Sequence, residues 1–305
     1  MPERTPIILD TDIGGDIDDT WALIMMLGCP ELDVRLITAS TGNVVLRAKL
    51  IAKLLEVAGR TDIPIGIGRR EPEMEKNTCS QAEWVEDYDL ADYGGTIYED
   101  GSEAIVRTIG ESAEPVTLVA IGPLPTVADA LRLEPHITSH SRFIGMHGSV
   151  YTGYGYDGSS EPCAESNVRF HTPDCQHVFS SDWDLTLTPL DTCGRVRLEG
   201  ELYRRLRDSN DPLIQALMLN NEIFARNITW WPDYNPALHS TTLFDTVAVY
   251  LAFSEELVRM ERLNIVVTDD GFTKIDNAGK PITCAVEWHD LAAFHALLVE
   301  RLLNR

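Results

Sequence analysis

Short apolar runs alternate with amphipathic stretches along the first half of the chain. Four runs have the length and the β-branched content of buried strands, at residues 6–10, 34–39, 63–67 and 116–121. Apolar residues recur at helical spacing over residues 19–28, 46–58, 104–109 and 126–133. The first helical stretch ends in Gly28 and Gly59 follows the second, as is common where helices end. Strands separated by helices predict an α/β fold with a mostly parallel central sheet that is flanked by helices on both faces.

The second half of the chain has a weaker pattern. Residues 145–162 (GMHGSVYTGYGYDGSSEP) are rich in Gly, Tyr and Ser, and loops of this length often carry function. Residues 223–234 form a second aromatic stretch. The elements predicted near the C-terminus are helices over residues 246–253 and 291–303 and a strand pair at residues 264–268 and 281–286. Since no linker or internal repeat divides the chain, we expect a single domain over residues 1–305.

The charge balance excludes several classes of partner. The chain carries 48 acidic residues against 25 basic ones, a formal charge of −23, and has no Lys/Arg-rich run, so we expect no nucleic-acid partner. Its longest apolar run, residues 21–27, is far shorter than the roughly 20 residues of a membrane helix, so we expect no membrane partner. The apolar stretch near the N-terminus covers only residues 7–9, and we expect no secretory signal.

The six cysteines are scattered singly along the chain. None forms a Cys-x-x-Cys pair, so zinc-ribbon and thioredoxin-type redox chemistry are unsupported. Together with the expected lack of a secretory signal, this pattern predicts reduced thiols and a cytoplasmic location.

Five carboxylates crowd the segment between the first predicted strand and the first predicted helix: Asp10, Asp12, Asp16, Asp18 and Asp19. In an open parallel sheet, ligands bind at the carboxyl ends of the strands. Packing so many like charges is costly unless a cation neutralises them, and ligands that are all oxygens favour Ca²⁺ or Mg²⁺ over Zn²⁺. A helix N-terminus would stabilise Asp18 and Asp19, but not all five carboxylates. The segment therefore predicts a site for a divalent cation.

Two cation-binding motifs can be compared with this spacing. An EF-hand loop that starts at Asp10 would need an acceptor where Gly14 stands and a glutamate where Trp21 stands, so this motif is excluded. A phosphatase of the haloacid dehalogenase type also begins with a strand and an Asp-x-Asp pair, which Asp10 and Asp12 match. In that alternative Asp10 is the nucleophile, Mg²⁺ is the cation, and residues 266–271 (VVTDDG) supply a second acidic motif.

The same acidic segment resembles the N-terminal signature of nucleoside hydrolases, the inosine–uridine-preferring family. Residues 8–14 (ILDTDIG) and 18–23 (DDTWAL) are similar to its usual form, DTDPGxDDAxAL, with two extra residues before the Asp pair. Further similar segments follow in the order of the family: 38–44 (TASTGNV), 63–68 (IPIGIG), 116–133 (VTLVAIGPLPTVADALRL), 164–167 (AESN), 188–192 (TPLDT) and 243–245 (LFD). Because these segments are collinear, the resemblance covers about residues 7–255.

The resemblance implies a nucleoside hydrolase-like, Rossmann-like fold and a Ca²⁺-dependent nucleoside N-ribohydrolase. Such an enzyme splits the N-glycosidic bond of a ribonucleoside into free base and ribose, a reaction of purine salvage. The four protein ligands that it implies for the ion are the carboxylates of Asp12, Asp19 and Asp245 and the main-chain carbonyl of Ile121. The residues that it implies at the ribose are Asp18, Asn43, Glu165 and Asn167, with Met146 near the sugar. Family members are commonly dimeric or tetrameric, so we expect a homo-oligomer whose small-molecule partner is a nucleoside.

Carried over to this chain, the chemistry has three parts. Asp12 would act as the general base toward the attacking water. The acidic wall would stabilise the oxocarbenium-like sugar of the transition state, and it would disfavour nucleotides because their phosphates are repelled. We expect Asp10 and Asp16 either behind the carboxylates that hold the ion or in a role that depends on the two-residue insertion.

One departure from the family pattern concerns the departing base. Inosine–uridine-type members place a His just before the C-terminal metal-binding Asp, whereas Phe244 stands at that place here. Purine-preferring members have an aromatic residue there, so we expect Phe244, helped by Trp84, Tyr154 or Trp230, to stack on a purine.

Other departures leave alternatives open. His239 and His147 are candidate proton donors in place of the missing His. Residues 81–95 lack the His-Gly…Asp-Gly pattern that hydrolases often carry, and Ser159 or Ser160 stands where a ribose-contacting Asn is common. A family member that binds a nucleoside without turnover is a third possible function.

Overall fold

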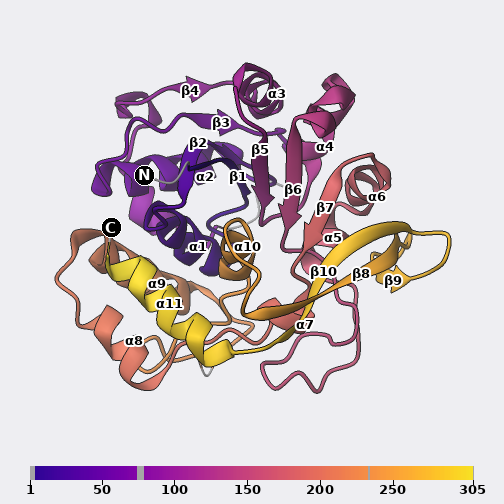
Figure 1. Cartoon of the computed structure of the whole chain (residues 1–305). Helices are drawn as coiled ribbons and strands as arrows, with labels where there is room; N and C mark the ends of the chain where they lie inside the picture. Colours follow the sequence, from indigo (N-terminus) through magenta and orange to yellow (C-terminus); the bar gives the residue numbers. More distant parts are fainter. Residues whose placement is uncertain (1–3, 74–78, 233, 305) are drawn as a thin grey trace.

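The strands form one sheet that runs through the molecule (Figure 1). The computed structural model describes residues 4–73, 79–232 and 234–304. The strand order is β4-β3-β2-β1-β5-β6-β7-β10-β8-β9. All neighbours from β4 to β10 in this spatial order pair in parallel, and β8 is antiparallel to both of its neighbours, β10 and β9. The strands are β1 (Thr5–Thr11), β2 (Leu32–Ala39), β3 (Ile65–Ile67), β4 (Ile97–Tyr98), β5 (Val116–Ala120), β6 (Ser141–Gly145), β7 (Asp184–Leu187), β8 (Val258–Val267), β9 (Thr273–Ile275) and β10 (Lys280–Trp288).

Helices follow the strands and bury both faces of the sheet (Figure 1). They are α1 (Asp18–Leu27), α2 (Val44–Val57), α3 (Gly101–Glu111), α4 (Pro125–Leu133), α5 (Ser166–Phe170), α6 (Thr172–Ser180), α7 (Leu190–Cys193), α8 (Gly200–Arg207), α9 (Pro212–Asn227), α10 (Thr246–Leu251) and α11 (Leu291–Leu303). Short 3₁₀ turns lie at η1 (Ala82–Val85), η2 (Leu90–Asp92) and η3 (Pro135–Ser139). Among the described helices, none combines the length and the apolar character needed to cross a membrane.

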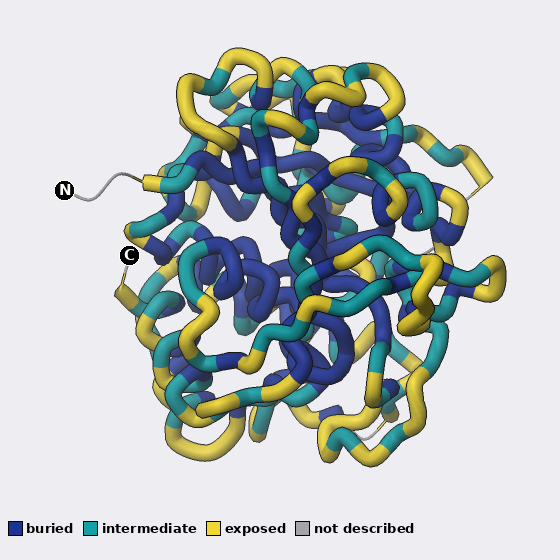
Figure 2. The backbone as a smooth tube through the Cα atoms, turned by 45° about the vertical axis from the view of Figure 1, so that its right-hand side comes forward, coloured by how far each residue is buried: buried dark blue, intermediate teal, exposed yellow. Residues whose placement is uncertain are grey.

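Side chains along β1 alternate between two apolar clusters. Ile7 and Leu9 pack in the cluster that holds the buried faces of α1, α2, α10 and α11. Ile8, between them, packs in the cluster that holds those of α3, α4 and α6. A strand that is covered on both faces reads as a continuous apolar run, as residues 7–9 do. Figure 2 shows the result: the central elements are buried, and exposed backbone is concentrated in the peripheral loops.

The expected fold class, a mostly parallel sheet flanked by helices, is confirmed. In the first half, the predicted strands correspond to β1, β2, β3 and β5, and the predicted helices to α1 through α4. The predicted strand pair near the C-terminus is the antiparallel pair β8 and β10. The pattern does not predict the short strands β4, β6, β7 and β9 or the helices between residues 166 and 227.

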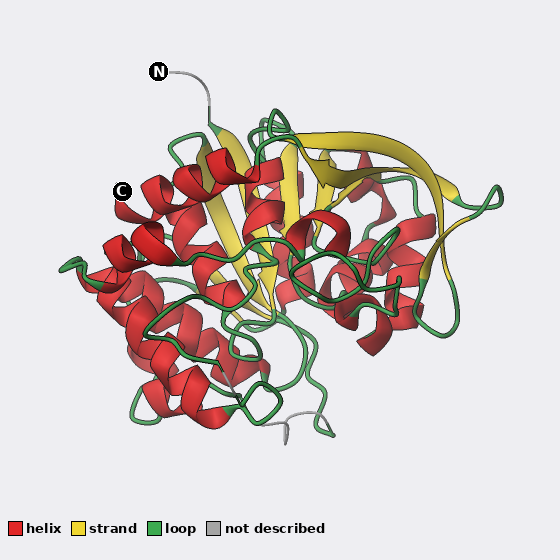
Figure 3. Cartoon of the chain, turned by 90° about the horizontal axis from the view of Figure 1, so that it is seen from below, coloured by secondary structure: helices red, strands yellow, loops and turns green. Residues whose placement is uncertain are grey.

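The register places the carboxyl ends of the parallel strands at one edge of the sheet. Thr11, at the end of β1, pairs with Ala39 at the end of β2, and Ala120 of β5 pairs with Gly145 of β6. The loops that continue from these strands therefore meet. Figure 3 shows long loops beyond this edge, with the N-terminus at the opposite end. Ligands of open parallel sheets bind at such an edge.

Candidate active site

A cavity of about 790 Å³ opens at the carboxyl edge of the sheet. It is lined by loops that follow β1, β2, β5 and β6 and by the starts of α1, α5 and α10. All ten residues predicted for the site lie on its wall: Asp12, Asp18, Asp19, Asn43, Ile121, Met146, Glu165, Asn167, Phe244 and Asp245. The structure thus brings the predicted set together, and the individual roles stay predictions.

Three buried carboxylates meet at one place on this wall. Asp18 and Asp19 occupy the first turn of α1, and Asp245 directly precedes α10, which packs against α1. One oxygen from each lies within 4.8 Å of the other two, and each residue is at most 4% exposed. Burial raises the pKa of all three carboxyls well above the ordinary value, and repulsion from neighbouring carboxylates, among them Asp12 and Asp16, raises it further. Buried oxygens held this close fit a hard divalent cation, which would remove that repulsion.

Asp12 lies beside this trio rather than within it. Its carboxylate is 3.8 Å from the guanidinium of Arg47 and packs on the backbone of Gly122, where a Cβ would lie 2.7 Å from Oδ1. Burial raises the pKa of Asp12, and the charge of Arg47 opposes that rise. The carbonyl of Ile121, the fourth predicted ligand, accepts a hydrogen bond of 3.1 Å from Asn167. The predicted ligand set therefore divides into Asp19 and Asp245 in the trio, and two groups on the adjoining wall.

The loop that carries the two extra residues is held by a distant segment. Gly14 has a φ of +102°, and a Cβ at this position would lie 2.5 Å from the sulfur of Cys79. Ser80 donates to the carbonyls of Gly14 and Gly15, and Gln81 donates to the carbonyl of Asp16. Asp16 lines the cavity, and burial raises its pKa to about 6. Asp16 is therefore part of the wall, and of its two expected places the loop with the two extra residues is the one that agrees with this position.

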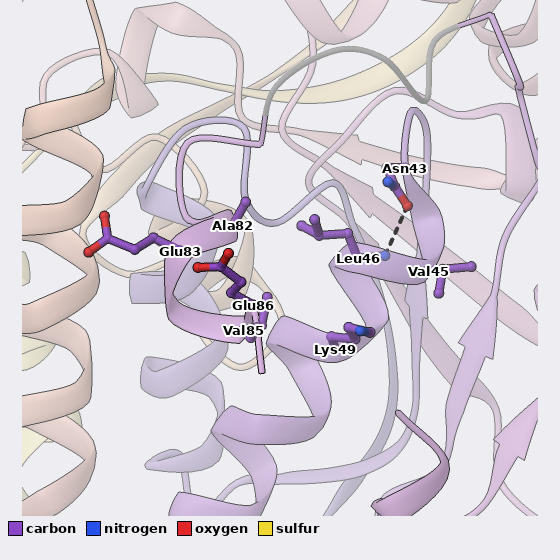
Figure 4. Close-up of a pocket in the computed structure, with 8 residues that line it drawn as sticks. All are labelled: Asn43, Val45, Leu46, Lys49, Ala82, Glu83, Val85 and Glu86. Carbon is purple, nitrogen blue, oxygen red and sulfur yellow. Dashed lines mark hydrogen bonds between the residues drawn. The ribbon is translucent and has the colours of Figure 1, made fainter. Parts of the chain in front are cut away.

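Two side-chain amides on the wall, those of Asn43 and Asn167, each use one polar atom in a hydrogen bond within the protein. Asn43 caps α2, because its Oδ1 accepts from the backbone N–H of Leu46 at 3.0 Å (Figure 4). A second hollow, of about 530 Å³, lies beside this cap between α2 and η1 and shares Asn43 with the cavity. Asn167 donates from Nδ2 to the carbonyls of Ile121 and Met146. Asn43 can therefore donate to a bound hydroxyl, and Asn167 can accept from one.

Glu165 is a buried carboxylate with a full set of backbone donors. It caps α5 by accepting from the N–H groups of Asn167 and Val168, and it also accepts from the N–H of Gly148. Burial raises its pKa to about 7, although these hydrogen bonds oppose the rise. The hydroxyl of Tyr154 donates toward Oε1 of Glu165 at 3.4 Å.

Aromatic rings form another part of the wall. Phe244 and Tyr154 meet edge to face with their ring centroids 6.0 Å apart, and both line the cavity. Trp230 also lines the cavity and is 62% exposed. Trp84, the remaining candidate for stacking, lies outside the cavity under the ammonium of Lys53, so that suggestion is wrong.

Neither candidate histidine faces the cavity. His147 is fully buried with one ring nitrogen 3.0 Å from the carbonyl of Gly122, and burial lowers its pKa to about 3. His239 packs against Trp231 and Tyr234. Neither residue is on the cavity wall, so neither replaces the missing His.

The sequence reasoning missed three basic residues on the wall, Arg47, Arg169 and His171. Arg47 donates to the carbonyls of Ile13 and Thr41 and so joins the loops after β1 and β2. His171 lies 3.4 Å from a carboxylate oxygen of Glu71 and 3.4 Å from one of Asp174, which together raise its pKa to about 9 even though burial opposes this. In the sequence, each of these basic residues lies close to a family-like segment. That closeness alone does not predict that the side chain lines the cavity.

The geometry does not support the phosphatase alternative. Asp10 is fully buried, is not on the cavity wall, and accepts a 2.6 Å hydrogen bond from Thr38. Asp269 and Asp270, from the proposed second motif, are exposed between β8 and β9. A nucleophile must reach its substrate, so Asp10 cannot serve in this role.

Fold and site together define a class of protein: an α/β enzyme with a carboxylate-lined cavity at the carboxyl edge of a parallel sheet. Within this class, the family model for inosine-uridine preferring nucleoside hydrolases matches residues 7–296. The chain belongs to that family, and it is an N-ribohydrolase, a glycosidase. This assignment also sets aside the phosphatase.

Relatives and solved structures agree with the assignment over nearly the whole chain. The chain is 28% identical to "Probable uridine nucleosidase 2" of Arabidopsis thaliana over 300 residues, which cover 94% of this chain and 91% of the relative. A plant nucleoside hydrolase, PpNRh1, has the same fold with a TM-score of 0.83 and 22% identity, over 99% of this chain and 100% of that one. A purine-preferring ribonucleoside hydrolase from Gardnerella vaginalis matches with a TM-score of 0.78 and 19% identity, over 98% of both chains.

Proposed function

We propose that this enzyme hydrolyses ribonucleosides to free base and ribose with a preference for purines, and that it depends on Ca²⁺. The observation that carries the proposal is the position of Phe244, an aromatic residue next to Asp245 on the wall of the cavity. Relatives of this chain include a uridine nucleosidase and a purine-preferring hydrolase, so the family alone leaves the base open. An aromatic wall offers more contact area to the two rings of a purine than to the single ring of a pyrimidine.

The cation would be held by Asp19 and Asp245, with Asp18 beside them, and by Asp12 and the carbonyl of Ile121 on the adjoining wall. All these donors are oxygens, which Ca²⁺ prefers. When bound, the ion lowers the pKa of a coordinated water and neutralises the carboxylates. Asp12 would then accept the proton of the attacking water, because the nearby guanidinium of Arg47 opposes the rise that burial causes in its pKa.

The sugar is oriented by the polar groups around it. Asn43 donates to a ribose hydroxyl, while Asn167, Asp18 and Glu165 accept from the others, and Met146 packs close to the ring. As the bond to the base breaks, positive charge develops on the sugar, and the acidic wall stabilises it. Repulsion by the same wall disfavours a 5′-phosphate, so a nucleoside rather than a nucleotide is the proposed substrate.

The departing base meets the aromatic part of the wall. Phe244 has no proton to donate, so it acts by stacking, with Tyr154 and Trp230 as further faces. Stacking against these rings raises the proton affinity of the purine, which takes up a proton from solvent and leaves as a neutral base.

A substrate panel tests the proposal. Release of reducing sugar is measured with inosine, guanosine, adenosine, uridine and cytidine, in Ca²⁺ and again in excess chelator. We expect purine ribonucleosides to be cleaved faster than pyrimidine ones, and activity to fall to background in chelator and return with Ca²⁺. Faster cleavage of uridine would overturn the purine preference, and full activity in chelator would overturn the role of the ion.

We also propose a cytoplasmic homo-oligomer that acts in purine salvage. The six cysteines are free in the structure, which suits a reducing compartment. The resemblance to the family supports a dimer or tetramer. Light scattering on the purified protein tests the assembly, and a mass equal to one chain of 34.0 kDa would contradict it.

A further inference from the structure

The segment that follows β7, residues 188–192 (TPLDT), has no part in the proposed chemistry, yet it runs beside the loop that follows β6. β6 and β7 are neighbouring parallel strands, so the segments that continue from them leave the sheet together. The N–H of Thr188 donates to the carbonyl of Gly145 at 2.9 Å, and the N–H of Leu190 donates to that of Gly148 at 2.9 Å. The two segments are therefore joined by hydrogen bonds as they leave the sheet.

Asp191, in the first turn of α7, joins the same two segments through its side chain. Its Oδ2 accepts from the backbone N–H of Val150 at 2.9 Å, and its Oδ1 accepts from those of Tyr151 and Thr152 at 2.7 and 3.2 Å. Asp191 is only 6% exposed, so these bonds are shielded from water. Successive N–H groups that converge in this way form an anion-binding concavity, and an ionised carboxylate can satisfy all three because neither oxygen carries a hydrogen.

α7 is itself fixed to the sheet, which gives Asp191 a rigid support. The hydroxyl of Thr192 donates to the carbonyl of Ala285 in β10 at 2.9 Å. The indole N–H of Trp288, also in β10, donates to the carbonyl of Thr192 at 2.9 Å. α7 accordingly lies against β10 (Figure 1). The position of the loop after β6 is thus set from the sheet through α7.

A second contact holds the outer part of this loop. Arg195, just after α7, donates from Nε to the carbonyl of Tyr156 at 2.7 Å. Its guanidinium packs directly on Gly158, where a Cβ would collide with Nη1 and where φ is +69°. Residues 154–160 include no buried residue, so their position depends on such contacts and not on an apolar core.

The loop held by these two contacts carries Tyr154 into the cavity. Tyr154 lines the cavity, and its ring meets that of Phe244 edge to face with the centroids 6.0 Å apart. Thr152, which Asp191 holds, and Tyr156, which Arg195 holds, flank it in the chain. Release of either contact would therefore move the ring of Tyr154 relative to Phe244, whereas the acidic trio, at the starts of α1 and α10, would keep its place.

We infer that Asp191 is a positioning residue that, together with Arg195, fixes the loop after β6 so that Tyr154 presents its ring to the base. This inference rests on the proposed function and gives residues 188–192 a role in it. Asp191 does not line the cavity, so it acts on the substrate only through the loop that it holds.

Asp191→Asn tests the contact with little change of shape. In either orientation, the NH₂ group of the amide must face at least one of the three backbone N–H groups, so a donor meets a donor. We expect kcat/KM for inosine, measured by release of reducing sugar, to fall about tenfold, the usual effect of one buried donor without a partner. Hydrogen exchange at the amides of residues 150–152, measured by mass spectrometry, should become faster than in wild type.

A double-mutant cycle with Tyr154→Ala separates positioning from a general loss of structure. If Asp191 acts through Tyr154, Asp191→Asn should lower kcat/KM by less than about twofold once the ring is absent. The rise in melting temperature caused by Ca²⁺ should be the same in Asp191→Asn as in wild type, because the trio does not belong to the loop. A tenfold loss that persists without the ring, or a loss of the stabilisation by Ca²⁺, would overturn the inference.

Asp100→Asn is the matched control. Asp100 also accepts from successive backbone N–H groups, those of Ser102 and Glu103 at 2.9 and 3.0 Å, but it caps α3 and does not line the cavity. We expect this variant to keep wild-type kcat/KM. A loss as large as that of Asp191→Asn would show that any broken cap has this effect, which would contradict a specific role for Asp191.

Arg195→Met serves as the test if Asp191→Asn does not fold. It removes the hydrogen bond to Tyr156 from a half-buried side chain and leaves α7 intact. We expect a smaller loss of kcat/KM for inosine than in Asp191→Asn, and no further loss when Tyr154→Ala is already present. Equal losses with and without the ring would again count against the inference.

The remaining outcomes separate the inference from the function on which it rests. If Asp191→Asn folds and keeps wild-type kcat/KM for inosine, the position of the loop does not affect the reaction, and the inference fails while the proposed function stands. If wild type releases sugar from no purine or pyrimidine ribonucleoside, the proposed function fails and the inference with it.

Discussion

At the scale of single residues, the carboxylates of the cavity differ in the charge of their nearest neighbours. Asp18, Asp19 and Asp245 face one another, so repulsion disfavours their ionised forms until a cation is bound. Asp12 instead faces the guanidinium of Arg47, which favours its ionised form. The first kind suits cation binding and the second suits proton acceptance, although all four lie in one cavity.

Replacement of Asp12 tests this division. Asp12→Asn keeps the shape of the side chain and removes the charge that accepts the proton of water. We expect kcat on inosine to fall by about 10³-fold or more, the range lost with a general base that also contacts the ion. The measurement is release of reducing sugar, with thermal unfolding as a check on folding.

Asp157→Asn is the control for that substitution, because Asp157 is an exposed carboxylate of the long loop that does not line the cavity. It should retain wild-type kcat. An Asp12→Asn enzyme with more than a tenth of wild-type kcat would contradict the assignment of Asp12 as base.

Replacement of Phe244 tests the origin of base preference. Phe244→Ala removes the ring next to Asp245 and the partner of Tyr154, so stacking with a purine is lost. We expect kcat/KM for inosine to fall roughly tenfold, as an aromatic contact of about 1–1.5 kcal/mol implies, and that for uridine to fall less. The two values are measured in parallel, and equal losses for both bases would count against stacking.

Some site residues could be predicted from the sequence because they lie in recognisable segments just after the ends of strands. Asp12 follows β1, Asn43 follows β2 and Ile121 follows β5, so a motif and its strand together place the side chain at the edge. His171 could not be found this way, because its partner Glu71 is 100 positions away in the chain. Its role depends on two loops that meet only in the folded protein.

At the scale of elements, a cluster of charges joins the segment after β3 to α4 and α6. Asp174 of α6 accepts from Arg69 and Arg132, and His171, which precedes α6, bridges Asp174 and Glu71. These groups draw the pKa of Asp174 well below its ordinary value, although burial opposes this, and they raise that of His171 to about 9. The cluster holds His171 at the wall of the cavity.

This cluster makes stability depend on pH in a defined window. The pKa of His171 is raised from 6.5 to about 9 in the folded protein, so its contribution is complete below pH 6.5 and is lost as pH rises through about 9. We expect the free energy of unfolding of His171→Gln to be lower than wild type by roughly 1–3 kcal/mol at pH 6, and the difference to shrink by pH 9.5. Urea unfolding at both pH values measures this.

His136→Gln is a control for the same experiment, because His136 is exposed on η3. It should show no comparable change between the two pH values. A His171→Gln deficit that is as large at pH 9.5 as at pH 6 would show that packing, not charge, is responsible.

Elements were predicted where the pattern is long and regular. The amphipathic stretch at 46–58 has a clear helical period and corresponds to α2, and the continuous apolar run at 7–9 lies in β1. β6 and β7 have only five and four residues, and α5 is a five-residue helix inside loop-like sequence, so none shows a period of its own. β6 is fixed by pairing with β5 and β7 by pairing with β6, and α5 by packing, none of which a local pattern records.

At the scale of the whole molecule, an excess of negative charge coincides with a buried acidic cavity. The formal charge is −23, and the carboxylates of the cavity add local repulsion that opposes folding. A cation that binds only the folded protein therefore stabilises it by mass action.

Thermal unfolding with and without Ca²⁺ tests that stabilisation. At a free Ca²⁺ concentration about 100 times the dissociation constant, we expect the folded state to gain about 2.7 kcal/mol over the chelator-treated protein, seen as a higher melting temperature. Asp245→Asn should lose most of this gain, because one of three carboxylates is neutral. An equal melting temperature for wild type in Ca²⁺ and in chelator would contradict a cation site in the trio.

The meeting of α1 with α10 has a consequence for biosynthesis. Asp19 and Asp245 are separated by 226 positions, so a nascent polypeptide that has emerged only through α9 already has the sheet's first strands but just two members of the acidic trio. If Asp245 holds the proposed cation, such a partial chain lacks one of its ligands, and we expect it to hydrolyse no nucleoside before synthesis is nearly finished. Proteolysis that removes the last fifth of the protein would silence it in the same way.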